Sequence, residues 1–154
     1  LYDVLDVVGR RFQEVFSQLF GGGTAQIVLT DPDNILTGGI DFYIQPPGKK
    51  RQQLTLLSGG ERALTVIALL FSFLDYRPAP FCVLDEVDAA LDEANVERFS
   101  SYLNRVNKET QFIVVSHRKK TMEAAEVLQG VTMVERGVSR LLTVAFEDVK
   151  EDLA

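Results

Sequence analysis

The sequence predicts an α/β fold with a core of parallel β-strands flanked by helices and a β-rich carboxy-terminal end. Two short runs, Phe81–Leu84 and Phe112–Val115, are continuously apolar, as strands covered on both faces of a parallel sheet are. Helix-like segments alternate with these runs from residue 58 onward, which is the order of a right-handed parallel crossover. At 154 residues, 46% of them apolar, the chain has room for one compact domain with a substantial core.

The bulk composition argues against several classes of protein. The net charge of -6 disfavours a free-standing nucleic-acid binder, which needs a basic surface to displace phosphate counterions. The single cysteine excludes an internal disulfide framework and fits a reducing compartment. The longest apolar run, Ala63–Leu74, is shorter than the ~20 residues that span a membrane. Because no signal peptide is visible, we expect a cytoplasmic protein with no membrane contact.

Residues 1–20 are expected to form a helix. Apolar side chains recur at alternating steps of four and three, the seam of a coiled coil: Leu1, Leu5, Val8, Phe12, Val15 and Leu19. The stretch is shorter than several heptads, so an amphipathic helix packed on the domain explains it equally well. Gly21-Gly22-Gly23 ends it, because glycine readily takes the left-handed conformation at a helix end. We therefore divide the chain into a helical or coiled-coil stub, residues 1–20, and a lobe of residues 21–154.

Further strands and helices follow in the order that the fold class requires. Two β-strand patterns, joined by turn residues 31–34, are Thr24–Thr30 and Ile40–Gln45. The expected helices are Gly59–Asp75, which is apolar on nearly every side, Asp92–Asn107 and Lys119–Leu128. The final β runs, joined by a turn at Gly137, are Val131–Glu135 and Leu141–Phe146.

The segment Leu57-Ser58-Gly59-Gly60-Glu61 opens the first of these helices. Glycines at a helix start expose backbone N–H groups where the helix dipole concentrates positive charge, and such a terminus attracts phosphate. Ser58 followed three residues later by Glu61 also fits a capping box, which needs no ligand. Two glycines at the first helical positions weaken that alternative, because they lower helix propensity without serving a cap.

The strand Phe81–Leu84 delivers two adjacent carboxylates, Asp85 and Glu86, to the carboxyl edge of the sheet, where the chemistry of such sheets lies. One of them can hold Mg²⁺ through water, because hard cations prefer oxygen ligands. The other can orient and deprotonate an attacking water. The alternative is that both are acidic residues leading into a helix, where the helix dipole favours them.

His117 is the only histidine of the sequence, and it ends the segment Val114-Val115-Ser116-His117. A lone histidine is usually a surface residue or a satisfied core residue. Its place at the carboxyl end of the strand after the acidic pair puts it beside the same edge of the sheet. Because all three segments converge on one edge, we favour a shared site over three separate structural roles.

These segments resemble the motifs of ABC-type ATPases. Leu57–Glu61 looks like the ABC signature and Phe81–Glu86 like the Walker B strand. Ala89-Ala90-Leu91-Asp92 resembles the D-loop, and His117 the switch histidine. Further segments resemble the carboxy-terminal head segment of prokaryotic, condensin-like SMC (structural maintenance of chromosomes) proteins: Phe20–Gly23, Thr30–Pro32, Gln45–Lys50 and Gly130–Met133. The resemblance extends from about Phe12 to Phe146.

The resemblance implies the carboxy-terminal half of an ABC-type ATPase head that uses ATP and Mg²⁺ to drive chromosome condensation and segregation. Asp85 would organise Mg²⁺, Glu86 would be the general base for the attacking water, and His117 would contact the γ-phosphate. The signature residues would bind ATP held by a second head in trans: Ser58, Gly59, Gly60 and Glu61. The D-loop residues would lie at the head–head interface: Ala89, Ala90, Leu91 and Asp92.

The chain lacks a phosphate-cradling loop of its own. That loop needs the pattern G-x-x-x-x-G-K-[ST], but Lys50 follows Gly48-Lys49 and Tyr43 stands at the first glycine position. SMC proteins carry this Walker A motif in an amino-terminal half, which a long coiled coil separates from the carboxy-terminal half. We therefore expect ATP hydrolysis only when that half completes the head, and an inactive chain in isolation.

The resemblance also implies partners: the amino-terminal half, a second SMC head, DNA through the assembled complex, and the carboxy-terminal winged-helix domain of a kleisin. The β runs within Val131–Phe146 are candidates for the kleisin site. Basic residues are candidates for DNA contact, although solvated charged loops explain them better: Lys49, Lys50, Arg51, Arg118, Lys119 and Lys120. A related ABC-type DNA-repair head and a non-catalytic kleisin-binding module remain the alternatives.

Overall fold

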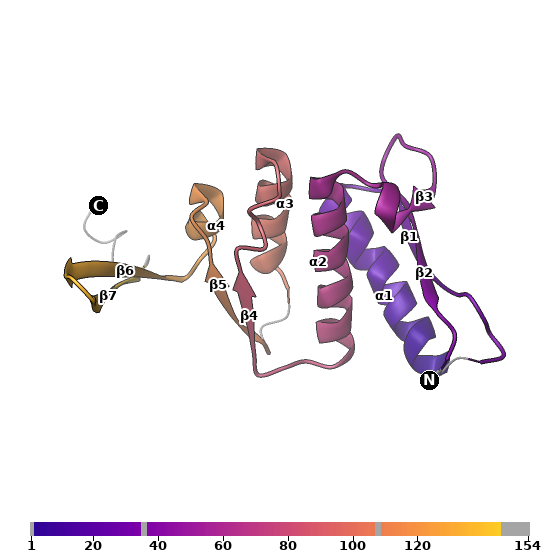
Figure 1. Ribbon diagram of the computed structural model, residues 1–154, viewed down its shortest axis with the longest axis horizontal. Coiled ribbons are helices and arrows are strands. Elements are labelled where there is room, and N and C mark those ends of the chain that lie inside the picture. Colours follow the sequence, from indigo (N-terminus) through magenta and orange to yellow (C-terminus); the bar gives the residue numbers. More distant parts are fainter. Residues whose placement is uncertain (1, 35–36, 107–108, 146–154) are drawn as a thin grey trace.

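The computed structural model describes residues 2–34, 37–106 and 109–145. Its elements in chain order are α1 (Tyr2–Phe20), β1 (Thr24–Leu29), β2 (Ile40–Gln45), β3 (Gln52–Gln53), the short 3-10 helix η1 (Leu54–Leu56), α2 (Gly59–Tyr76), β4 (Phe81–Asp85), α3 (Glu93–Leu103), β5 (Gln111–Val115), α4 (Lys119–Glu123), β6 (Val127–Glu135) and β7 (Val138–Ala145). The molecule is elongated, with the β1–β3 sheet at one end and the β6–β7 hairpin at the other (Figure 1). The predicted α/β class is confirmed.

Helix α1 packs on the domain along its apolar face. Val8, Phe12, Val15 and Leu19 are at most 2% exposed, so an amphipathic helix accounts for this part of the seam. Leu5 is only half-buried, and Leu1 lies outside the described residues. The division of the chain at residue 20 stays a prediction.

The turn between α1 and β1 depends on glycine. Gly23 has a φ of +84°, and a Cβ atom at this position would lie 2.3 Å from the carbonyl oxygen of Gln45, so no other residue fits without moving the backbone. Gln13 of α1 then ties the helix to the first strand. Its side chain donates to the carbonyl of Gly23 at 3.1 Å and accepts from the backbone N–H of Ala25 at 2.8 Å.

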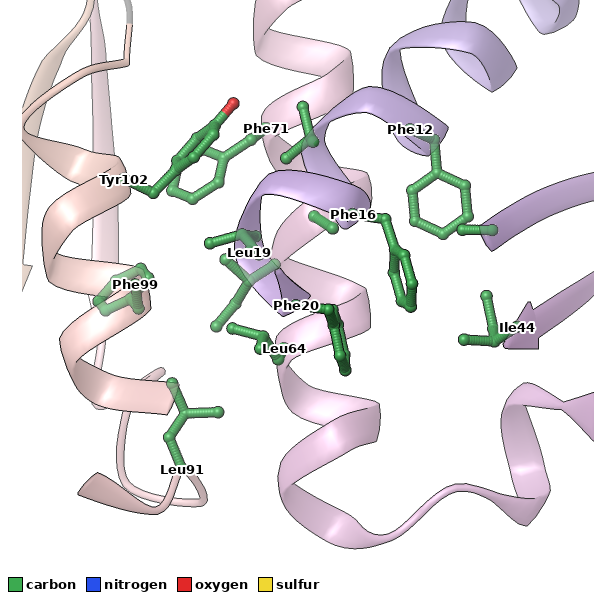
Figure 2. Close-up of a cluster of buried hydrophobic side chains, with 14 of the residues drawn as sticks. Phe12, Phe16, Leu19, Phe20, Ile44, Leu64, Phe71, Leu91, Phe99 and Tyr102 are labelled. Carbon is green, nitrogen blue, oxygen red and sulfur yellow. The ribbon is translucent and has the colours of Figure 1, made fainter. Parts of the chain in front are cut away.

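The core lies where α1, α2 and α3 meet (Figure 2). Phe71 of α2 is fully buried, and its ring centroid lies 5.0 Å from that of Tyr102 and 5.7 Å from that of Phe112. Burial, with a smaller contribution from Asp75, raises the pKa of Tyr102 to about 12. The Tyr102 ring therefore enters the core as a neutral group.

Strands β4 and β5 form a two-stranded parallel sheet, as predicted. One face packs against the core through Cys82, Leu84, Phe112 and Val114. The prediction that both faces are covered is wrong for the described residues, because the opposite face is open. Its side chains are about half-exposed: Phe81 59%, Val83 55%, Ile113 46% and Val115 50%. We call this set the open sheet face.

Several predicted boundaries are wrong. Helix α3 ends at Leu103, and residue 107, its expected end, lies outside the described residues. Helix α4 ends at Glu123 rather than Leu128, because Val127 pairs with Ala145 and the antiparallel ladder of β6 and β7 takes over. This hairpin is therefore longer than expected at its start, while Phe146 lies outside the described residues. No described helix is long and apolar enough to cross a membrane.

Candidate functional site

The first turn of α2 is held by the capping box that the sequence allowed. The backbone N–H of Glu61 donates to Ser58 Oγ at 3.4 Å, and the backbone N–H of Ser58 donates to Glu61 Oε2 at 3.2 Å. The Ser58 hydroxyl also donates to Glu61 Oε2 at 2.8 Å. The structural explanation for Ser58 and Glu61 is thus correct, and any ligand role is additional to it.

Glu61 also pairs with a lysine from the loop after β2. Lys49 Nζ lies 2.7 Å from Glu61 Oε1, and the Glu61 side chain is 15% exposed against 53% for Lys49. Burial by itself raises the pKa of Glu61, but the hydrogen bonds from Lys49 and Ser58 outweigh burial and leave the pKa below its usual value. Glu61 is therefore a carboxylate at neutral pH.

The signature segment lies against the predicted D-loop. A Cβ atom on Gly60 would lie 3.1 Å from the carbonyl oxygen of Ala90, so the absence of a side chain permits this close approach. An open cavity of about 570 Å³ lies at this junction, and its walls include Ser58, Gly60, Glu61, Ala90 and Asp92. The first turn of α2 and the carboxyl ends of β4 and β5 also face the same side of the molecule (Figure 1).

Asp85 and Glu86 stand at the carboxyl end of β4 with both side chains exposed. Glu86 has a φ of +49°, a left-handed conformation that is uncommon outside glycine and asparagine. Its backbone N–H donates to the carbonyl of Val115 at 2.9 Å, and its carbonyl accepts from the N–H of Ala89 at 3.0 Å. The left-handed residue turns the chain sharply out of β4, and backbone strain of this kind is common at functional sites.

Within the predicted D-loop the side chains point in different directions. Ala89, Ala90 and Asp92 are exposed, and Asp92 caps α3 by accepting from the N–H of Asn95 at 2.8 Å. Leu91 is only 2% exposed and belongs to the core. Its side chain therefore anchors the loop, and only the other three can present side chains to a partner.

Sequence reasoning missed a buried hydrogen-bond network centred on Asp88. This fully buried carboxylate accepts from Ser116 Oγ at 2.6 Å and from Thr121 Oγ1 through the same oxygen. Ser116 Oγ accepts in turn from the backbone N–H of Arg118 at 3.0 Å, and the Arg118 guanidinium donates to the carbonyl of Leu91. The loop after β4 and the loop after β5 are thus joined. The sequence carries no local signal for this burial, because Asp88 is one of four acidic residues between positions 85 and 92.

His117 is exposed and lies in that second loop. Its neighbours on either side, Ser116 and Arg118, both belong to the Asp88 network. The backbone carrying His117 is therefore fixed relative to the loop that follows Glu86, while its side chain is exposed.

The exposed carboxylates at the end of β4 are ligands of the type that Mg²⁺ prefers, but they are too few to hold the ion by themselves. Within residues 2–34, 37–106 and 109–145, no cluster of three histidine, cysteine, aspartate or glutamate side chains could hold a metal ion. Mg²⁺ usually keeps several waters and takes one or two carboxylates plus phosphate oxygens. The exposed Asp85 suits one such position, so the remaining ligands would come from nucleotide, water or another chain segment.

Most of the candidate DNA-contacting cations have partners within the chain. Besides Lys49 and Arg118, the guanidinium of Arg51 lies 4.6 Å from the ring centroid of Tyr43. Lys119 and Lys120 lie 3.7 and 3.5 Å from the carboxylate of Glu123. These contacts agree with the interpretation of the basic residues as a solvated charged surface.

Comparisons of the sequence and of the structure with known proteins both point to the same protein family. The profile of the RecF/RecN/SMC N-terminal domain matches residues 29–140. The chain is 60% identical over 149 residues to the Chromosome partition protein Smc of Bacillus subtilis (strain 168), covering 97% of this chain and 13% of the relative. It is 56% identical over 147 residues to the protein of that name from Lactiplantibacillus plantarum, covering 96% of this chain and 12% of the relative. The chain thus spans about an eighth of the length of these relatives.

Solved structures match nearly all of the chain. One, described as "Structural biochemistry of ATP-driven dimerization and DNA stimulated activation of SMC ATPases", superposes with a TM-score of 0.86 at 36% identity and covers 98% of this chain and 91% of that chain. The Smc head of Pyrococcus furiosus, bound to the C-terminal domain of ScpA, superposes with a TM-score of 0.87 at 37% sequence identity. The match covers 96% of this chain and 37% of that chain. The fold is therefore that of a portion of an SMC ATPase head, and the chain belongs to the SMC family of proteins.

Proposed function

We propose that this chain is the carboxy-terminal half of an SMC ATPase head, and that it hydrolyses ATP only together with its amino-terminal half and a second head. The observation that carries the proposal is the contact between the start of α2 and the D-loop at Gly60 and Ala90, in a chain without a phosphate loop. A helix start that meets an interface loop in an open cavity is suited to complete the nucleotide site of another subunit.

The residues have separate proposed roles. Gly59 and Gly60 would donate backbone hydrogen bonds to the γ-phosphate in trans, since the first N–H groups of a helix lack helical partners, and Ser58 would donate through its hydroxyl. Glu86 would accept a proton from the attacking water, because its carboxylate is exposed at the carboxyl end of β4, where the left-handed residue turns the chain out of the strand. Asp85 would hold Mg²⁺ and His117 would contact the γ-phosphate. ATP with Mg²⁺, when bound, supplies the phosphoryl group that the water attacks.

The open sheet face supports a missing partner segment. Apolar side chains line both strands there, and burying such a face is the main way a parallel sheet is stabilised. The amino-terminal half of the head is the proposed cover, because the relatives are about eight times longer than the matched segment. Completion of the sheet and completion of the nucleotide site would then be one event.

We expect the purified chain alone to show negligible ATP turnover, because it lacks the phosphate loop. Mixing it with the amino-terminal head half should restore turnover, measured as phosphate release at saturating ATP. The amino-terminal half by itself is the control and should also be inactive. Equal turnover by the chain alone and by the mixture would contradict the split site.

Ser58→Arg in the assembled head should block ATP-driven dimerisation. The side chain would fill the space into which the γ-phosphate must fit and remove the cap of α2, so we expect dimerisation to weaken by ~10²-fold or more. Sedimentation with and without ATP measures this effect. Ser101→Arg, on the exposed side of α3, introduces the same side chain elsewhere and should dimerise as the parent does.

The hairpin of β6 and β7 supports a kleisin-binding role for the same chain. Its apolar side chains are exposed on both faces, including Val131 at 70%, Val134 at 66% and Leu141 at 64%. Exposed apolar patches of this kind mark protein interaction sites. The proposed occupant is the carboxy-terminal winged-helix domain of a kleisin, as with ScpA on the solved Smc head. DNA contact is proposed for the assembled complex, in the cytoplasm at the nucleoid.

A further inference from the structure

A lysine, a glutamate and the signature serine form a continuous chain of polar contacts. Lys49 Nζ lies 2.7 Å from Glu61 Oε1, and Ser58 Oγ donates to Glu61 Oε2 at 2.8 Å. All three residues line the cavity of about 570 Å³ at the start of α2. The contact from Lys49 crosses from the loop after β2 to α2, so it is not part of the local capping box.

The carboxylate of Glu61 presents a difficulty for the proposed function. An acidic residue in the first turn is favourable for the helix itself. A γ-phosphate arriving at the same turn is also anionic, and like charges brought together oppose binding. Moreover, the Ser58 hydroxyl donates its proton to Glu61 in this structure, so it must turn away from Glu61 before it can donate to a phosphate oxygen.

We propose that Lys49 is a positioning residue for the signature: it neutralises Glu61 and weakens its hold on the Ser58 hydroxyl, so that the helix start can receive the phosphate of a second head. The inference rests on the proposed function. The lowered pKa of Glu61, to which Lys49 contributes after burial has raised it, agrees with a carboxylate whose charge is already compensated. In this proposal Lys49 acts through Glu61, which it contacts.

The test uses the assembled head carrying Glu86→Gln, so that ATP-bound dimers accumulate, and measures the dimer dissociation constant by sedimentation without DNA. Lys49→Met should raise this constant about tenfold, since a half-exposed ion pair is lost and an uncompensated carboxylate is left facing the phosphate. Lys50→Met, in the exposed neighbour, is the matched control and should match the parent.

The decisive variant is the double change Lys49→Met with Glu61→Gln. Removing the carboxylate removes the need for the lysine, so dimerisation should return to within about threefold of Glu61→Gln alone, as a coupled pair requires. A merely structural loss would not be rescued, and melting temperatures report whether each variant is folded. Lys49→Met dimers as tight as the parent, or failure of the rescue, would overturn this inference alone. A parent head that forms no ATP-dependent dimers would overturn the proposed function and this inference with it.

Discussion

Glu86→Gln in the assembled head is expected to lower ATP turnover by ~10²–10⁴-fold, the usual contribution of a general base. Glutamine keeps the shape of the side chain and its reach from the end of β4, but it cannot accept a proton from water. The left-handed backbone at residue 86 is set by the N–H bond to Val115 and the following turn, and both survive the change. Phosphate release at saturating ATP measures the loss.

The same variant should still dimerise with ATP, because the binding groups are untouched. Glu97→Gln, on the exposed side of α3, makes the same chemical change away from the sheet edge and should hydrolyse ATP at the parental rate. Parental turnover by Glu86→Gln would show that another group is the base.

Phe71→Ala is expected to destabilise the chain by about 3–5 kcal/mol, the usual cost of deleting a buried aromatic ring. Phe71 is fully buried and contacts the rings of Phe99, Tyr102 and Phe112. These rings come from α3 and β5, so the cavity would lie between three elements that cannot easily close it. Urea denaturation followed by circular dichroism measures the free energy of unfolding.

Phe73→Ala is the matched control for that prediction. Phe73 lies two residues away on α2 but is 48% exposed, so its loss should cost no more than about 0.5 kcal/mol. Similar costs for the two variants would mean that the ring cluster around Phe71 is not the centre of the core.

The strands and helices were predictable wherever one local pattern dominated. The buried helix from residue 59, the parallel pair and the helix at the start all follow from periodicity and from glycine or proline at their ends. The structure of segment 124–128 was not predictable, because its apolar residues suit helix and strand alike, and the pairing of Val127 and Leu128 with β7 places its end in a strand. β3 and η1 were missed since such short elements carry no period.

The candidate site was predictable in its motifs and not in its contacts. The sequence placed Ser58, Glu86 and His117 at strand and helix ends, but it contained no sign that Lys49 reaches Glu61 across the fold. The burial of Asp88 was hidden for the same reason, because its partners lie 28 and 33 residues further along the chain. Long-range polar pairing is fixed by packing, which no local pattern encodes.

The Asp88 network implies concerted motion of two loops. Opening either loop means breaking the hydrogen bond from Ser116 Oγ to the buried Asp88 Oδ2, which also accepts from Thr121 of α4, and a buried carboxylate without partners is costly. The loops should therefore fluctuate as one cooperative unit rather than separately. A ligand that shifts Ser116 and His117 would then displace Ala89 and Ala90 without touching them, which would couple the proposed nucleotide site to the proposed subunit interface.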